Sequence, residues 1–136
     1  MKPPAEDFKD LLLLSSSGTG LVFKTDLFVA LEPDIENASP IVTLYDVGGD
    51  RPQFNLSGYN YYVVRVQARI RGAEFGYQAA YTVAETVRDA LHDLSNQTVN
   101  STRYILISAS TDIFAIGFDE NNRPIFTVNF LAHRTV

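Results

Sequence analysis

The most regular alternation of apolar and polar positions lies between residues 60 and 71. Every second position is apolar, at Tyr62, Val64, Val66, Ala68 and Ile70, and the positions between them hold Val63, Arg65, Gln67, Arg69 and Arg71. Because successive side chains of a β-strand point to opposite faces, this pattern predicts a strand with one apolar face and one face that carries three guanidinium groups. We expect a helix to cover the apolar face, and the arginine face to meet water, a carboxylate or another subunit.

Apolar positions at helical spacing predict two helices. The longer helix covers about 75–94 and is closed by residues 95–97; its apolar positions are Tyr77, Ala80, Ala84, Val87, Leu91 and Leu94. The shorter helix covers about 5–15. Prolines precede its first turn, and acidic residues lie near the positive end of its dipole.

Short apolar runs predict the other strands at 21–23, 27–31 and 41–46, around 104–108, and as a hairpin pair at 113–118 and 125–132 joined by the loop 119–124. A turn is predicted over 47–52 and irregular structure over 53–60. Strands and helices do not alternate strictly, which favours an α+β fold. We expect a mostly antiparallel sheet packed by one long helix and a short N-terminal helix. The length of 136 residues favours a single domain over 1–136.

Composition narrows the function classes. The absence of cysteine excludes disulfides, thiolate metal sites and a cysteine nucleophile. The net charge of −5 argues against a general nucleic-acid binder, although a local basic stripe remains possible. No apolar run approaches the length of a membrane span, and the first residues do not resemble a secretory signal. Four Asn-x-Ser/Thr matches are therefore expected to be chance; they begin at Asn37, Asn55, Asn96 and Asn100.

Few residues are candidates for chemistry. His92 lies beside Asp89 and Asp93 on the predicted long helix, a group that could bind a metal or act as a base, but a solvated helical face is the simpler interpretation. His133 is expected at a strand edge, in contact with solvent or a neighbour. The polar loop 15–20 lacks the Gly-Lys-Ser/Thr end of a phosphate-binding loop, and no Gly-x-Ser-x-Gly motif occurs. We expect no catalytic, cofactor-binding or metal-binding residues, and no enzyme activity.

The arginine face is the stronger candidate for function. Arg65 and Arg69 are expected about 13 Å apart along the strand, a spacing that can pair with phosphates or with carboxylates of another subunit. Cross-strand salt bridges on a solvated face are the alternative. Large amphipathic rings nearby often anchor interfaces. The candidate interface residues, for a subunit or another partner, are Arg65, Arg69, Arg71, Tyr59 and Tyr61.

From Leu27 to Arg134 the chain resembles the tail-terminator and minor-capsid group of tailed bacteriophage proteins. The resemblance covers about four-fifths of the chain and is carried by LFV at 27–29, PIVTLYDVGG at 40–49, VRVQARIRG at 64–72, the helix at 77–94, IGFDENNRP at 116–124 and FTVNF at 126–130. The order helix, strands, strand, helix, strands is also similar.

The resemblance implies a structural role in the virion. It implies a ring of identical subunits, usually six, that caps the head-proximal end of the tail tube, stops its polymerisation and joins tail to head or neck. The implied partners are the tail tube protein and a connector or stopper protein, with genome DNA passing through the lumen without sequence-specific binding. The implied location is the virion, with the host cytoplasm as the place of assembly. No cofactor and no catalytic residue follow from it.

Three alternatives stay open at this point. The chain could be a head–tail connector or minor capsid subunit of the neck, which the sequence separates poorly from a tail terminator. It could be a small module that binds a ligand or nucleic acid, although its acidic charge disfavours the latter. It could be an enzyme, although no group of residues meets the geometric requirements of a catalytic site.

Overall fold

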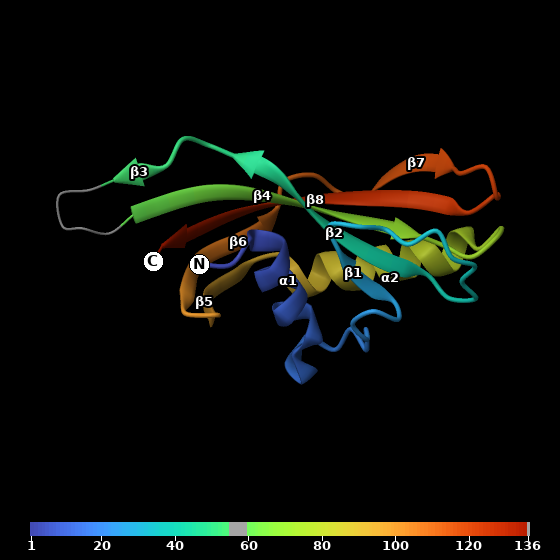
Figure 1. The fold of residues 1–136 in the computed structure, drawn as a ribbon, viewed down its shortest axis with the longest axis horizontal. Coiled ribbons are helices and arrows are strands. Elements are labelled where there is room, and N and C mark those ends of the chain that lie inside the picture. The colour runs from blue at the N-terminus through green and yellow to red at the C-terminus, as the bar shows by residue number, and fades with distance from the viewer. Residues whose placement is uncertain (55–59, 136) are drawn as a thin grey trace.

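The computed structural model describes residues 1–54 and 60–135. Two helices, α1 and α2, lie on the same side of a long twisted sheet (Figure 1). The helices are α1 (Pro4–Leu13) and α2 (Tyr77–Leu91), and a short 3₁₀ turn, η1, covers Ser15–Ser17. The strands are β1 (Leu27–Val29), β2 (Ile41–Gly49), β3 (Gln53–Phe54), β4 (Asn60–Arg71), β5 (Leu94–Val99), β6 (Thr102–Ala109), β7 (Phe114–Phe118) and β8 (Pro124–Thr135). Neither described helix has the length and apolar character needed to cross a membrane.

The sheet is mixed, with strand order β1-β2-β4-β8-β6-β5. The first pair, β1 and β2, is parallel, and the other described pairs are antiparallel. β3 adds to β4, and β7 adds to β8. The prediction of an α+β fold is confirmed. The predicted hairpin of the last two strands is present as β7 and β8.

The centre of the sheet is the long antiparallel pair of β4 and β8. Their register runs without interruption from Tyr61 opposite Thr135 to Arg71 opposite Ile125. Ten residue steps separate these two rows, or about 33 Å. β3 and the start of β6 flank the first row, and we call this region the β3 end. β7 and the start of β2 flank the second row, which we call the β7 end (Figure 1).

The apolar face of β4 packs under both helices, as its alternation predicts. Val66, Ala68 and Ile70 are fully buried, and their register partners on β8 are Phe130, Val128 and Phe126. The buried positions of α2 are Ala80, Ala84, Val87 and Leu91. From α1, Phe8 inserts its ring edge-on between those of Tyr104 and Phe130, 6.0 Å from each centroid. Such aromatic contacts add to the stabilisation that burial itself provides.

A buried polar network anchors α1 to the sheet. The Asp7 side chain is inaccessible to solvent and accepts a 2.6 Å hydrogen bond from the Tyr104 hydroxyl and a 2.8 Å hydrogen bond from the Asn100 amide. The Arg134 guanidinium lies 3.5 Å from the same carboxylate and donates to the backbone oxygen of Lys2. Burial and the hydrogen bond to Asp7 raise the pKa of Tyr104. The hydroxyl therefore stays protonated and donates to the carboxylate.

Several predicted boundaries are wrong. α2 has 15 residues and ends at Leu91, because the next residue, His92, is already extended, with φ −74° and ψ 136°, and Asp93 follows with a positive φ of 58°. Residues 95–97, expected to close the helix, belong to β5. The turn expected at 47–52 starts late, since β2 continues to Gly49 through a register shift after Asp46. A Cβ at Gly49 would overlap the Val63 backbone oxygen, so this close approach requires glycine.

The strands predicted at 21–23 and 27–31 also differ from expectation. Residues 21–23 form only an isolated bridge, Phe23 to Leu27, and β1 is shorter than the predicted 27–31. Of the region expected to be irregular, 53–54 form β3, and 55–59 lie outside the described residues. α1 spans 4–13 where 5–15 is predicted.

Candidate functional site

The outer face of the sheet, opposite the helices, carries the three arginines of β4. They differ in how much solvent their side chains meet: 42% of the Arg65 side chain is exposed, 36% of Arg69 and 5% of Arg71. Arg65 contacts the exposed Asp50 at 2.9 Å, and Arg69 contacts Glu32 at 3.1 Å. The alternation in the sequence correctly puts all three on one face, but only the first two reach solvent there.

The Arg71 side chain is bound by the protein's own segment 32–35. Its guanidinium lies 3.6 Å from Glu32 and donates hydrogen bonds to the backbone oxygens of Pro33 at 2.9 Å and Ile35 at 3.1 Å. Burial lowers the pKa of Arg71, the nearby positive charge of Arg123 lowers it further, and Glu32 opposes both. In this structure the side chain holds the segment 32–35 across the β7 end of the outer face. A partner could reach it only if that segment moved.

Arg123, in the loop between β7 and β8, is a second clamp on the same segment. Its guanidinium donates to the Ile35 backbone oxygen at 2.9 Å and to the Asp34 carboxylate at 3.2 Å. Asp119 binds it from the other side at 2.7 Å. Sequence reasoning did not single out Arg123, because its partners at 34 and 35 are distant in the chain and loop residues carry no periodic signal.

The carboxyl group of Asp119 makes the stability of this clamp depend on pH. Burial would raise the pKa of Asp119, but hydrogen bonds from the backbone and side chain of Arg123 and from the Asn121 amide outweigh it, so the pKa lies below its ordinary value. A carboxyl whose pKa is lowered on folding adds stability above its unfolded pKa, and this stability is lost as the pH falls through the folded pKa.

We therefore expect the amide NMR signals of Asn121 and Arg123 to move together on acidification, with a midpoint below the ordinary aspartate value of about 3.9. The measurement is a titration of both amides between about pH 6 and 2. Asp119→Asn is the control and should remove the transition. A midpoint at or above the ordinary value would contradict the clamp.

Tyr61 lies at the β3 end of the outer face. Its hydroxyl forms a hydrogen bond with Nδ1 of His133, and the two ring centroids are 5.7 Å apart. The expectation that His133 lies at a strand edge is wrong, because β8 runs between β4 and β6 and is paired on both sides at this residue. Tyr59, the other aromatic candidate, lies outside the described residues.

The other sequence candidates have structural partners. His92 accepts a 3.0 Å hydrogen bond from the Ala109 amide through Nδ1, and its Nε2 lies 3.4 Å from Asp93. In the loop 15–20, the hydroxyls of Ser17 and Thr19 both donate to the Leu12 backbone oxygen and so satisfy the C-terminus of α1. Within the described part of the chain, no three His, Cys, Asp or Glu side chains are grouped to hold a metal ion.

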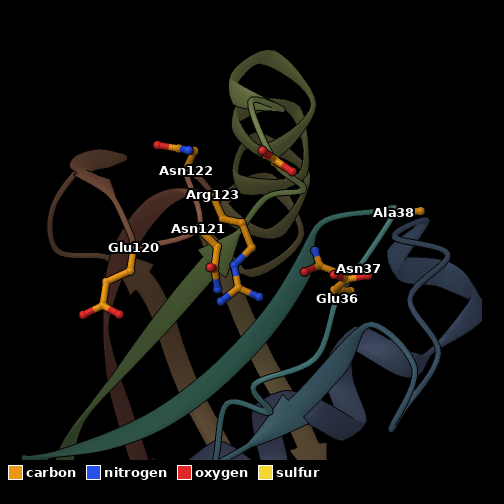
Figure 2. A pocket seen from close by; sticks show the side chains of 8 residues that line it. Glu36, Asn37, Ala38, Glu120, Asn121, Asn122 and Arg123 are labelled. Carbon is orange, nitrogen blue, oxygen red and sulfur yellow. The ribbon is translucent and has the colours of Figure 1, made fainter.

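A hollow at the β7 end has a volume of about 680 Å³. Three segments line it: residues 36–38, Glu74 and residues 120–123. Figure 2 shows Arg123 projecting between Asn121 and the strip that carries Glu36 and Asn37, with Glu120 set apart on the far side of the loop. The lining is polar and open, and Arg123, the one cation among its described residues, is already bound by Asp34 and Asp119. It offers neither a nucleophile with a base nor an apolar seat for a small ligand.

Comparison with known proteins identifies the class of protein. A search of curated proteins finds no match to this chain. Among solved structures, the fold is similar to a chain in the virion of a native gene transfer agent particle, with a TM-score of 0.70 over 98% of this chain and 96% of that one. The identity of 16% makes this a likeness of fold.

The sequence comparison is more specific. Residues 14–136 match the model of a family described as bacteriophage tail terminator protein, which leaves only the segment with α1 outside the match. This match covers most of the chain and agrees with the resemblance noted between Leu27 and Arg134. The chain belongs to the bacteriophage tail terminator family, a family of virion structural proteins.

Proposed function

We propose that copies of this chain associate side by side in a closed ring of six that caps the head-proximal end of a phage tail tube. The ring stops further polymerisation of the tube and presents a surface to the head or neck. The family supports the role in the tail. The observation that carries the ring is the outer face of the sheet, where Arg65 and part of Arg69 stay exposed while the helices seal the opposite face.

The arrangement suits a closed ring. In a ring each subunit contacts its neighbours through two different surfaces, so one chain must carry both halves of the contact. This chain presents guanidinium groups on β4 and exposed carboxylates in the loops around 36 and 120. Genome DNA would pass through the lumen without sequence-specific binding, in keeping with the net charge of −5.

A neck role is the second candidate. A head–tail connector or minor capsid subunit would also assemble as a ring, and the similarity of fold to a chain of a virion particle is compatible with either position. The two roles differ in what they bind. A tail terminator binds the end of the tube, whereas a neck subunit binds the head side of a tail that is already complete.

The first test is the mass of the assembly. Light scattering of the purified protein, alone and after addition of tail tubes, should give a mass near six times 15.1 kDa, or a monomer that is depleted from solution by the tubes. A monomer that ignores the tubes would contradict the proposal.

Arg65→Glu tests the outer face. We expect it to weaken self-association about tenfold or more, because a like charge at a contact opposes docking, while the melting temperature changes little since the Arg65–Asp50 pair is exposed. Lys24→Glu, an exposed charge reversal in the loop before β1, is the matched control and should assemble normally. Equal assembly by the two variants would remove Arg65 from the interface.

A further inference from the structure

The two ends of the sheet carry opposite unpaired charges. At the β7 end, Glu36, Glu74 and Glu120 are exposed, and none forms an ion pair within the described residues. At the β3 end, Arg51 and Arg103 are exposed and likewise have no carboxylate partner among the described residues. These two groups lie at opposite ends of the long β4–β8 pair, whose end rows are about 33 Å apart. Each protomer is therefore polar along its longest dimension.

The β7 end also carries an apolar strand edge. β7 pairs with β8 on one side only within the described chain, so its other side presents backbone N–H and C=O groups. Phe114, Ile116 and Phe118 are each more than half exposed. Tyr77 stacks on Phe118 with centroids 6.1 Å apart and extends the apolar surface toward α2. Exposed apolar side chains along an unpaired strand edge are typical of an interaction surface.

We propose that the β7 end of one copy docks against the β3 end of the next copy, and that this is the contact between neighbours in the ring. The inference rests on the proposed ring and adds which surfaces meet. Charge complementarity favours a second copy as the occupant: the carboxylates around β7 would face the guanidinium groups of Arg51 and Arg103 on the neighbour. Arg65, which is exposed but already contacts Asp50, lies beside them on the same surface. Two β7 ends would bring like charges together, so a head-to-tail contact is favoured over a twofold one.

The receiving surface has apolar area as well. On β6, Ile105 and Leu106 are partly exposed, and Arg103 precedes them on the same strand. The opposing residue of Arg103 on β8 is Thr135, which in turn lies opposite Tyr61. An apolar centre rimmed by complementary charge is the usual composition of a specific interface. The contact should weaken as salt rises, because its charges are exposed before docking.

Two charge-reversed variants test the contact. Variant A carries Arg51→Glu, Arg65→Glu and Arg103→Glu, so both of its ends are acidic. Variant B carries Glu36→Lys, Glu74→Lys and Glu120→Lys, so both of its ends are basic. Each variant alone should associate about 100-fold more weakly than the wild type. An equimolar mixture should assemble again, because every A–B contact joins unlike charges and the two alternate around a ring of even number.

The readout is the mass distribution in solution, with circular dichroism melts to confirm that both variants fold. Unchanged assembly of A or B alone would overturn the docking contact, and so would failure of the mixture of folded variants to assemble. Ile116→Lys tests the apolar edge: it should weaken assembly about tenfold or more, while Val22→Lys, an equally exposed site before β1, should not. A wild-type chain that stays monomeric with and without tubes would instead refute the proposed ring, and the contact with it.

Discussion

Asp7→Ala should lower the free energy of unfolding by about 3–5 kcal/mol, because it leaves the Arg134 guanidinium buried without its carboxylate. The variant also removes the acceptor of the Tyr104 hydroxyl, which lies 2.6 Å from Asp7 in a site closed to solvent. Most single substitutions at a protein surface change the free energy of unfolding by much less. Chemical denaturation monitored by circular dichroism measures it directly.

The matched control is Asp10→Ala, one turn further along α1. Asp10 accepts a hydrogen bond from the same Asn100 and contacts Lys9 and Lys2, but its side chain reaches solvent. Its loss should cost at most about 1 kcal/mol. If the two variants unfold at the same denaturant concentration, the network around Asp7 does not anchor α1 as described.

Arg71→Ala should destabilise the fold by about 2–3 kcal/mol, since it leaves the Pro33 backbone oxygen without its donor and removes one of the two arginines that pair with the largely buried Glu32. The Ile35 oxygen keeps its hydrogen bond from Arg123. Arg65→Ala, on the same face of the same strand, should change stability by about 1 kcal/mol or less. Thermal melts of the two variants measure the difference. Similar melting temperatures would show that Arg71 does not clamp the segment 32–35.

This pair of variants separates a structural arginine from one free for assembly. Only the Arg65 position should affect association without affecting the melt. The sequence pattern treats the two positions as equivalent, because strand periodicity assigns a face and says nothing about which loop crosses it. The segment 32–35 is polar and lies far from Arg71 in the chain, so its contact with β4 depends on the tertiary fold.

The elements with strong periodicity were predictable. The alternation over 60–71 places β4 and its buried residues Val66, Ala68 and Ile70, and the helical spacing places α2. Local cues failed where the outcome depends on distant backbone. β2 passes the glycines at 48 and 49 because β4 is there to pair with, and residues 95–97 pair with β6 instead of closing the helix.

The candidate surfaces also divide into those that the sequence predicts and those that depend on the tertiary fold. The arginine face follows from the sequence, and the virion family follows from the resemblance and the matched model. Arg123 and the apolar edge of β7 could not be found, since one acts through loop contacts and the other is notable only because no described strand covers it. Phe114, Ile116 and Phe118 look like ordinary strand residues until their exposure is known.

The most direct test of the proposed ring is negative-stain microscopy of the purified protein with and without tail tubes. We expect rings, free or seated on one end of each tube, and capped tubes that stop lengthening when more tube protein is added. Tubes that stay bare and continue to grow in the presence of the protein would contradict it.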